Sequence, residues 1–156
     1  MKKLILSLPI LFAFVLILSS CGKDAPEPTL TEKLTKTFTV SIAKEGGVEV
    51  YNKTKATNIA SGYSNYKLSL SSTKSATLTA KDNTTFTGTW ALTNTDKTLS
   101  LTGLKTSAGA NPTGTTGTIE FTIVTIDGTG SAVTLESLQP DIKASNSIVN
   151  LQLVNP

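Results

Sequence analysis

The sequence lacks histidine and arginine entirely and contains a single cysteine, Cys21. The absence of histidine excludes Ser-His-Asp and Cys-His catalysis, histidine-ligated zinc and a histidine pH switch. Because all 14 basic residues are lysines, the chain also lacks the bidentate guanidinium group that phosphate and base-edge recognition usually employs. One cysteine cannot form an intramolecular disulfide. The fold must therefore be held together by its apolar core and its backbone hydrogen bonds.

The first 20 residues have the composition of a secretory signal peptide. Lys2 and Lys3 precede an uncharged, mainly apolar run from Leu4 to Leu18. Fifteen residues in a helix extend over roughly 22 Å, which is less than the roughly 30 Å hydrocarbon core of a bilayer. A transmembrane anchor is therefore the weaker alternative.

The apolar run ends in Leu18-Ser19-Ser20-Cys21. This stretch resembles the lipobox of bacterial lipoproteins that are cleaved by signal peptidase II. The resemblance implies that the Cys21 thiol receives a diacylglycerol, that the chain is cleaved after Ser20 and that the new amino group is acylated. Acyl chains such as palmitate would hold the protein in a membrane, because each buried CH₂ contributes about 0.8 kcal/mol. The alternative is an ordinary signal peptide with a cysteine at its cleavage site.

The next residues, Gly22-Lys23-Asp24, resemble the start of many lipoproteins of Bacteroidota-type bacteria. This resemblance implies a lipid-anchored protein of the outer membrane and favours display at the cell surface. A simple solvated tether is the alternative. Removal of Lys2 and Lys3 with the signal leaves 12 lysines against 11 acidic residues, so the basic charge of the precursor is no argument for a nucleic-acid partner, and we predict none.

We predict three segments: a signal peptide over residues 1–20, a lipidated N-terminus and flexible tether over residues 21–36, and one antiparallel β domain over residues 37–156. Pro26 and Pro28 stiffen the tether and disfavour helix and strand there.

From residue 37 onward, apolar side chains alternate with Thr and Ser in short runs, and turn residues separate these runs about every ten residues. This pattern predicts an all-β domain, either a single antiparallel β-sandwich or a meander barrel, of about eight or nine strands. The expected runs are 38–42, 48–50, 66–70, 76–80, 86–93, 99–101, 119–126, 133–135 and 149–153, with a Gly46-Gly47 turn, a mobile loop over 105–118 and a bulge near Ile123.

One hairpin resembles a known family. The stretch Phe86-Thr87-Gly88-Thr89-Trp90-Ala91-Leu92, followed by a turn and Leu99-Ser100-Leu101, is similar to the Gly-Thr-Trp hairpin of small lipocalin-like lipoproteins. The resemblance covers about twenty residues. It implies a barrel whose closed end is plugged by Trp90 and whose lumen holds a small apolar ligand. An open sandwich would use the same Trp as an ordinary core residue.

The remaining polar residues give weak signals for chemistry. The acidic residues have no apolar flanks that would raise their pKa, so we interpret them as solvated charge and predict no catalytic, cofactor or metal site. Asp127-Gly-Thr-Gly-Ser131 is interpreted as a hairpin turn rather than a calcium or phosphate loop. Tyr51, Tyr63 and Tyr66 could stack on a sugar ring, and Tyr63 and Tyr66 are expected to be the most exposed of the three. The favoured interpretation is that one of the tyrosines packs and the others decorate a loop.

Together these patterns predict a non-enzymatic binding or structural module on an envelope lipoprotein. A closed barrel would bind a small apolar ligand in a cavity lined by Leu78, Leu92, Leu101 and Phe121. An open sandwich would instead bind glycan or protein through the tyrosine loop or its sheet edges. Tyr63, Tyr66 and Trp90 are the candidate ligand contacts.

Overall fold

The computed structural model describes residues 26–156, and over this range the regular secondary structure is almost entirely β. A five-residue helix, α2 (Leu30–Leu34), precedes nine strands, and two short 3₁₀ helices, η1 (Ser61–Asn65) and η2 (Ile142–Ala144), lie in the connections. The strands are β1 (Thr37–Glu45), β2 (Val48–Asn52), β3 (Lys67–Leu70), β4 (Ser75–Thr79), β5 (Thr85–Thr93), β6 (Thr98–Lys105), β7 (Ile119–Ile126), β8 (Ala132–Ser137) and β9 (Val149–Val154). The all-β prediction is confirmed.

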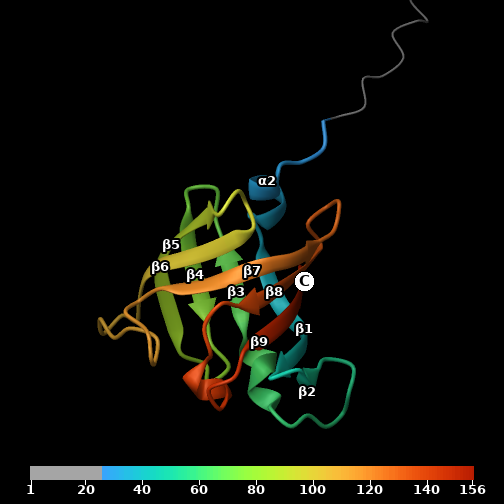
Figure 1. The fold of residues 1–156 in the computed structure, drawn as a ribbon, viewed down its shortest axis with the longest axis vertical. Helices are drawn as coiled ribbons and strands as arrows, with labels where there is room; N and C mark the ends of the chain where they lie inside the picture. The colour runs from blue at the N-terminus through green and yellow to red at the C-terminus, as the bar shows by residue number, and fades with distance from the viewer. Residues whose placement is uncertain (1–25) are drawn as a thin grey trace, which may run out of the picture.

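The sheet closes on itself through β1. Neighbouring strands pair antiparallel from β3 to β9, and β9 pairs with one edge of β1. The other edge of β1 pairs with two strands in succession: Thr37–Thr39 pair with β3, and Ile42–Glu45 pair with β2. The result is a closed eight-stranded barrel with β2 as an extra strand (Figure 1). Of the two architectures that the sequence left open, the barrel is correct and the open sandwich is wrong.

The apolar side chains that alternate along each strand point into the barrel and fill its interior. In β9, for example, the buried side chains of Val149, Leu151 and Leu153 alternate with half-buried ones. The predicted bulge is present, because the pairing of β7 with β8 shifts register between Ile123 and Thr125. The inward alternation of all eight barrel strands produces one contiguous apolar core.

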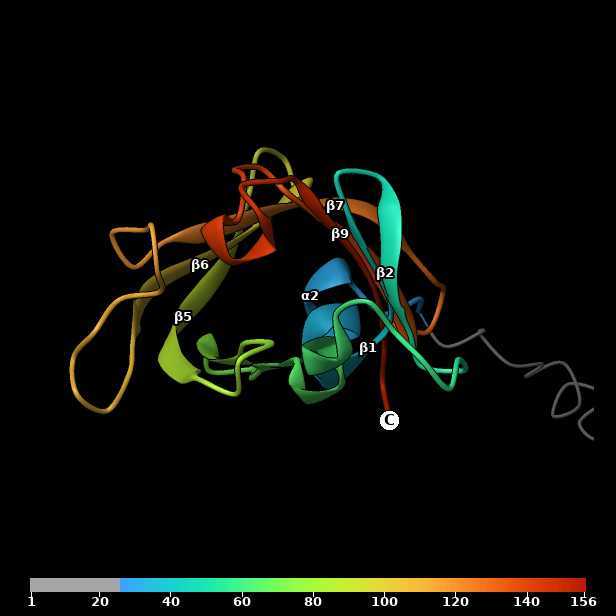
Figure 2. The ribbon, with the colours of Figure 1, turned by 90° about the horizontal axis from the view of Figure 1, so that it is seen from below.

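Helix α2 lies across one end of the barrel. Its N-terminus carries a capping box, in which the Thr29 hydroxyl accepts the Glu32 N–H and the Glu32 carboxylate accepts the Thr29 N–H. Leu34 at its other end is fully buried. In the end-on view the barrel strands surround α2 (Figure 2). This segment lies within the predicted flexible tether over residues 21–36, and the prediction is wrong for it, because α2 packs on the barrel and buries Leu34.

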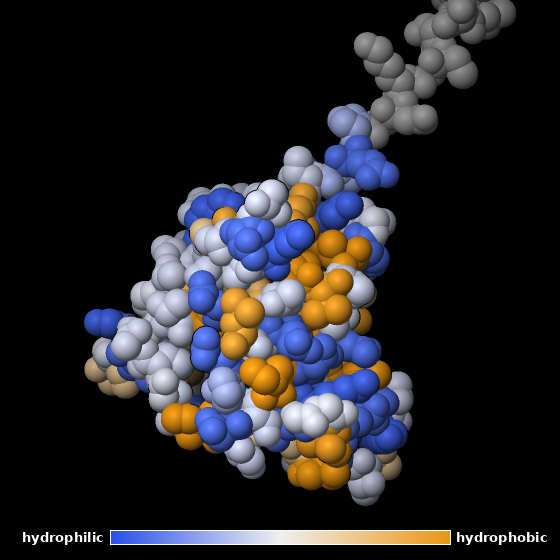
Figure 3. All heavy atoms as spheres, viewed as in Figure 1, coloured by the Kyte–Doolittle hydropathy of each residue, from blue (hydrophilic) through white to orange (hydrophobic). Residues whose placement is uncertain are grey.

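The extra strand does not offer a free edge for docking. The Val50 carbonyl accepts the Ala60 N–H at 2.9 Å, and the Asn52 N–H donates to Asn58 Oδ1 at 2.7 Å. The loop that follows β2 therefore covers its outer edge. The apolar side chains on the face seen in Figure 3 form small separate groups divided by polar residues.

The predicted signal peptide and Cys21 lie outside the described residues. Within residues 26–156, no helix is both long enough and apolar enough to cross a bilayer. Lipidation of Cys21 stays a prediction.

Candidate ligand-binding cavity

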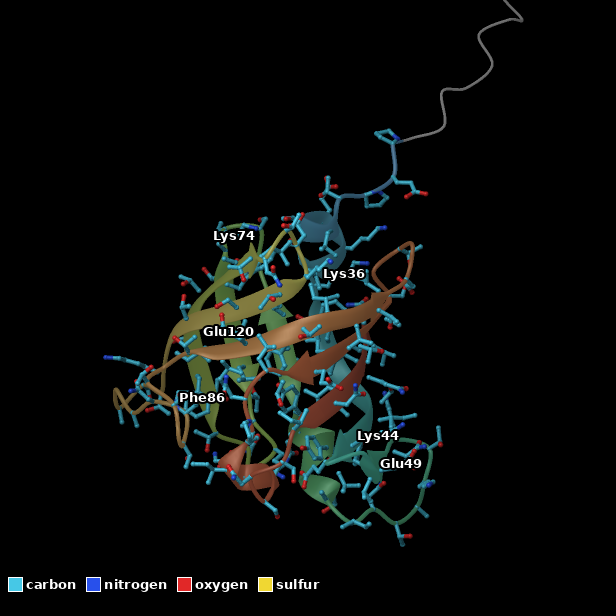
Figure 4. All side chains as sticks on the ribbon, in the orientation of Figure 1. Lys36, Lys44, Glu49, Lys74, Phe86 and Glu120 are labelled. Atoms are coloured by element: carbon cyan, nitrogen blue, oxygen red, sulfur yellow. The ribbon has the colours of Figure 1, made fainter. Side chains whose placement is uncertain are left out.

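A cavity of about 400 Å³ lies at the end of the barrel opposite α2. Its inner wall is made of apolar side chains that point inward from the strands or their ends. Its mouth is formed by η1, the β4–β5 turn, the β6–β7 loop and the β8–β9 connection. The apolar wall comprises Leu78, Ala80, Phe86, Ile119, Phe121, Val149 and Leu151. In Figure 4, Phe86 lies in the half of the barrel nearer η2, whereas Lys74 lies at the α2 end.

Three tyrosines pack in series beside the mouth. The ring centroids of Tyr51 and Tyr63 are 6.3 Å apart, and those of Tyr63 and Tyr66 are 6.2 Å apart. Tyr63 and Tyr66 are only 2% and 8% exposed, so the prediction that they are exposed was wrong. Their rings are buried because η1 folds back against β1 and β2. The exposed sugar-stacking loop that we considered is therefore not formed, and both side chains line the cavity instead.

One carboxylate joins three elements at the mouth. Oε1 of Glu45 accepts hydrogen bonds from the Tyr63 hydroxyl at 2.8 Å and from Lys81 Nζ at 2.6 Å. The Glu45 and Lys81 side chains are 15% and 19% exposed. Burial, together with the hydrogen bond to Glu45, raises the pKa of Tyr63 well above its usual value, so this hydroxyl stays protonated at neutral pH. The end of β1, η1 and the β4–β5 turn are thereby held together.

A second ion pair joins the β4–β5 turn to η2. Lys143 Nζ lies 2.5 Å from Asp82 Oδ2, and this hydrogen bond lowers the pKa of Asp82 to about 2. Both lysines that line the cavity, Lys81 and Lys143, therefore have their own carboxylate partners.

Two further polar groups at the mouth are less well satisfied. Oδ1 of Asp141 accepts the Lys143 N–H at 2.8 Å, but no lysine among the described residues lies within ion-pair distance of this carboxylate. The Tyr66 hydroxyl forms no hydrogen bond with any described residue, and it is not fully enclosed. Burial and the charge of Asp141 both raise the pKa of Tyr66, so this group is a neutral phenol.

Trp90, the third predicted contact, does not line the cavity. Its Nε1 donates to the Ser71 carbonyl at 2.9 Å, and Lys74 Nζ lies 3.8 Å from the centroid of its ring. The neighbouring Gly88 allows a close approach of two strands, because a Cβ there would lie 2.4 Å from the Thr102 carbonyl oxygen. The structure thus brings Tyr63 and Tyr66 together and leaves Trp90 at the α2 end. Contact of the two tyrosines with a ligand stays a prediction.

The predicted cavity wall is half right. Leu78 and Phe121 line the cavity, whereas Leu101 is fully buried in the core and Leu92 packs against it. Sequence reasoning missed the residues that the β6–β7 loop and the β8–β9 connection contribute, because loop residues follow no period. A long Gly- and Pro-rich loop between strands was the available signal. The missed residues include Pro112, Thr115, Gln139 and Asp141.

The Asp127 segment is a hairpin turn, as predicted. Its Oδ1 accepts the Ser131 N–H at 2.7 Å and its Oδ2 accepts the Ala132 N–H at 3.1 Å. Within residues 26–156, no three His, Cys, Asp or Glu side chains lie close enough together to hold a metal ion.

No protein-family model matches the chain, and a search of curated proteins found no match. Among solved structures, the chain is similar to a lipocalin-like protein from Bacteroides uniformis ATCC 8492, with a TM-score of 0.48 and 15% sequence identity. The alignment covers 80% of this chain and 99% of that chain.

Proposed function

We propose that this protein is a lipid-anchored binding protein of the cell envelope whose barrel holds a small, mainly apolar ligand. The observation that carries the proposal is the cavity of about 400 Å³, which lies within the range of about 300–1,000 Å³ that is common for small-molecule sites. Its wall is apolar and its mouth carries a few polar groups. Such an arrangement removes an apolar body from water while the polar groups orient it.

The mouth favours binding over catalysis. The Glu45 and Asp82 carboxylates each form an ion pair with a lysine, so neither is free to act as a general base. The Tyr63 hydroxyl is likewise occupied by Glu45. These contacts fix the shape of the mouth and support a non-enzymatic role.

The cavity is tested with a matched pair of substitutions. Ala80 lines the cavity, so Ala80→Trp fills it, whereas Ala91→Trp places the same bulk on an exposed position of β5. The probe is 2-naphthalenemethanol, a neutral molecule with an apolar body, and its affinity is measured by calorimetry. We expect the unmodified chain and Ala91→Trp to bind equally, and Ala80→Trp to bind at least about tenfold more weakly. A chain that does not bind the probe, or an Ala80→Trp variant that binds it unchanged, would contradict the proposal.

The proposed anchor rests on the lipobox resemblance of Leu18-Ser19-Ser20-Cys21. Metabolic labelling with palmitate should place label on the full-length chain, and Cys21→Ser should abolish the label and leave the precursor uncleaved. Outer-membrane location and surface display are part of the same proposal. Protease treatment of intact cells tests the display. Labelling that persists in Cys21→Ser would refute acylation at this residue.

A further inference from the structure

The charges around the cavity mouth do not balance. Two lysines, Lys81 and Lys143, line it, and each is held by a carboxylate at 2.6 Å and 2.5 Å. Two further carboxylates, those of Asp141 and Glu120, line the same cavity, and neither has a lysine partner among the described residues. The charged groups that line the cavity and their ion-pair partners therefore leave two negative charges uncompensated among the described residues, and Asp141 is the one near Tyr66, beside a wall of low polarity in which charges interact strongly.

An unpartnered hydroxyl lies near this carboxylate. Tyr66 is 8% exposed and lines the cavity, and its hydroxyl forms no hydrogen bond with a described residue. Among the described side chains, Thr39 Oγ1 is the one fully enclosed polar atom without a partner, so the Tyr66 oxygen is not fully enclosed, and Tyr66 is one of the residues that line the cavity. A buried hydroxyl is expected to have a partner. The phenol can donate one hydrogen bond and accept others.

We propose that the cavity selects an apolar ligand with a positively charged nitrogen head, such as a primary amine, which donates to the Asp141 carboxylate and the Tyr66 oxygen. This inference rests on the proposed function, because it names the ligand class of the same cavity. The apolar wall takes the body of the ligand, and the head stays at the mouth. A carboxylate head would face Asp141 with like charge and is disfavoured.

The two lysines do not reverse this preference. Lys81 donates to Glu45 and Lys143 donates to Asp82, so an anionic head would have to compete with an existing ion pair for either of them. A cationic head breaks neither pair. The ring of Tyr63, which lines the cavity, already has Lys81 Nζ at 5.0 Å from its centroid, so it does not provide a second cation site.

The test uses three probes with the same naphthalene body: 2-naphthylmethylamine, 2-naphthalenemethanol and 2-naphthoate at neutral pH. Calorimetry on the folded chain gives the three dissociation constants. We expect the amine to bind about tenfold more tightly than the alcohol, and the carboxylate to bind at least about tenfold more weakly than the alcohol.

Two variants locate the effect. Asp141→Asn removes the charge and keeps the shape, so the amine should lose about tenfold in affinity while the alcohol changes by less than about twofold. Tyr66→Phe keeps the ring and removes the hydroxyl, so the amine and the alcohol should both weaken by about two- to tenfold. Asp96→Asn is the matched control, because Asp96 is an exposed carboxylate in the β5–β6 turn, which lies away from the cavity.

The outcomes separate the two proposals. A cavity that binds the three probes equally, prefers the carboxylate, or keeps its amine preference in Asp141→Asn would refute the cationic head and leave the apolar cavity standing. If none of the three probes binds, the proposed function fails, and the head preference fails with it.

Discussion

Two ion pairs on the first hairpin test how burial changes the contribution of a salt bridge to the free energy of unfolding. Glu45 in β1 and Glu49 in β2 each accept a lysine Nζ at 2.6 Å, from Lys81 and Lys55 respectively. The Glu45 pair is 15% and 19% exposed, whereas the Glu49 pair is 32% and 60% exposed. The same Glu→Gln substitution at either site removes one negative charge and keeps the size of the side chain. The two variants therefore differ in burial and in the second hydrogen bond that Glu45 accepts from the Tyr63 hydroxyl.

We expect Glu45→Gln to lower the free energy of unfolding by about 2 kcal/mol, because it weakens two hydrogen bonds to a charged group and leaves Lys81 without its partner. In a domain of this size that loss lowers Tm by roughly 6–10 °C. Glu49→Gln should leave Tm almost unchanged, because water replaces the partner of an exposed charge.

The assay is thermal unfolding followed by circular dichroism, with chemical unfolding as a second measure of the free energy. Trp90 fluorescence reports the same transition from the α2 end of the barrel. Tyr63→Phe provides a check, because it removes one of the two hydrogen bonds and should cost less than Glu45→Gln. Equal losses for the two Glu→Gln variants would refute the role assigned to burial.

Two further predictions concern the tyrosines and the closed end. Burial raises the pKa of Tyr63 and Tyr66 above that of unfolded tyrosine, so unfolding releases their protons and stability should fall as pH rises above about 10. Tyr63→Phe/Tyr66→Phe should flatten that loss in chemical unfolding between pH 9 and 11.5, and an unchanged slope would contradict the assignment. Gly130→Ala should destabilise the domain by about 2 kcal/mol or more and expose α2 to protease, because φ is +69° and the new Cβ would lie 2.4 Å from the Lys33 carbonyl oxygen. Gly128→Ala is its control in the same turn, where a Cβ would meet no atom within 4 Å, and equal protease sensitivity in both variants would refute the contact.

Most strands could be predicted because their side chains alternate over enough residues. Val149, Leu151 and Leu153 are buried with the parity that the sequence indicates, and Gly46 and Gly47 adopt positive φ at the first hairpin turn. Closure of the barrel could not be predicted in the same way. It depends on pairing between β1 and β9, which lie more than a hundred residues apart, and alternation within a strand does not specify its partner.

The sequence contained a signal for helix α2, but the neighbouring prolines obscured it. Thr29 and Glu32 have the spacing of a capping box. Leu30 and Leu34 are four residues apart, which places them on the same face of a helix. Pro26 and Pro28 instead suggested a tether over the whole segment. Burial of Leu34 against the barrel, together with the capping box, stabilises so short a helix.

The cavity itself was only partly predictable. Leu78 and Phe121 are inward positions of strands, so their role in a lumen follows from parity. An inward residue lines the cavity or packs in the core according to its position along the barrel axis. Phe121 lines the cavity, whereas Leu101 is fully buried in the core. Asp141 and Tyr66 reach the mouth through irregular segments whose path no local pattern specifies.

The chain enters the barrel at the α2 end, and the cavity opens at the other. A strand of nine residues such as β5 spans roughly 30 Å, about the thickness of the hydrocarbon core of a bilayer. Under the proposed acylation of Cys21, the lipid would be attached on the side of the α2 end, and the mouth of the cavity would lie at the other end of the barrel. The proposed ligand would then enter and leave the cavity at the end of the barrel farther from the anchor.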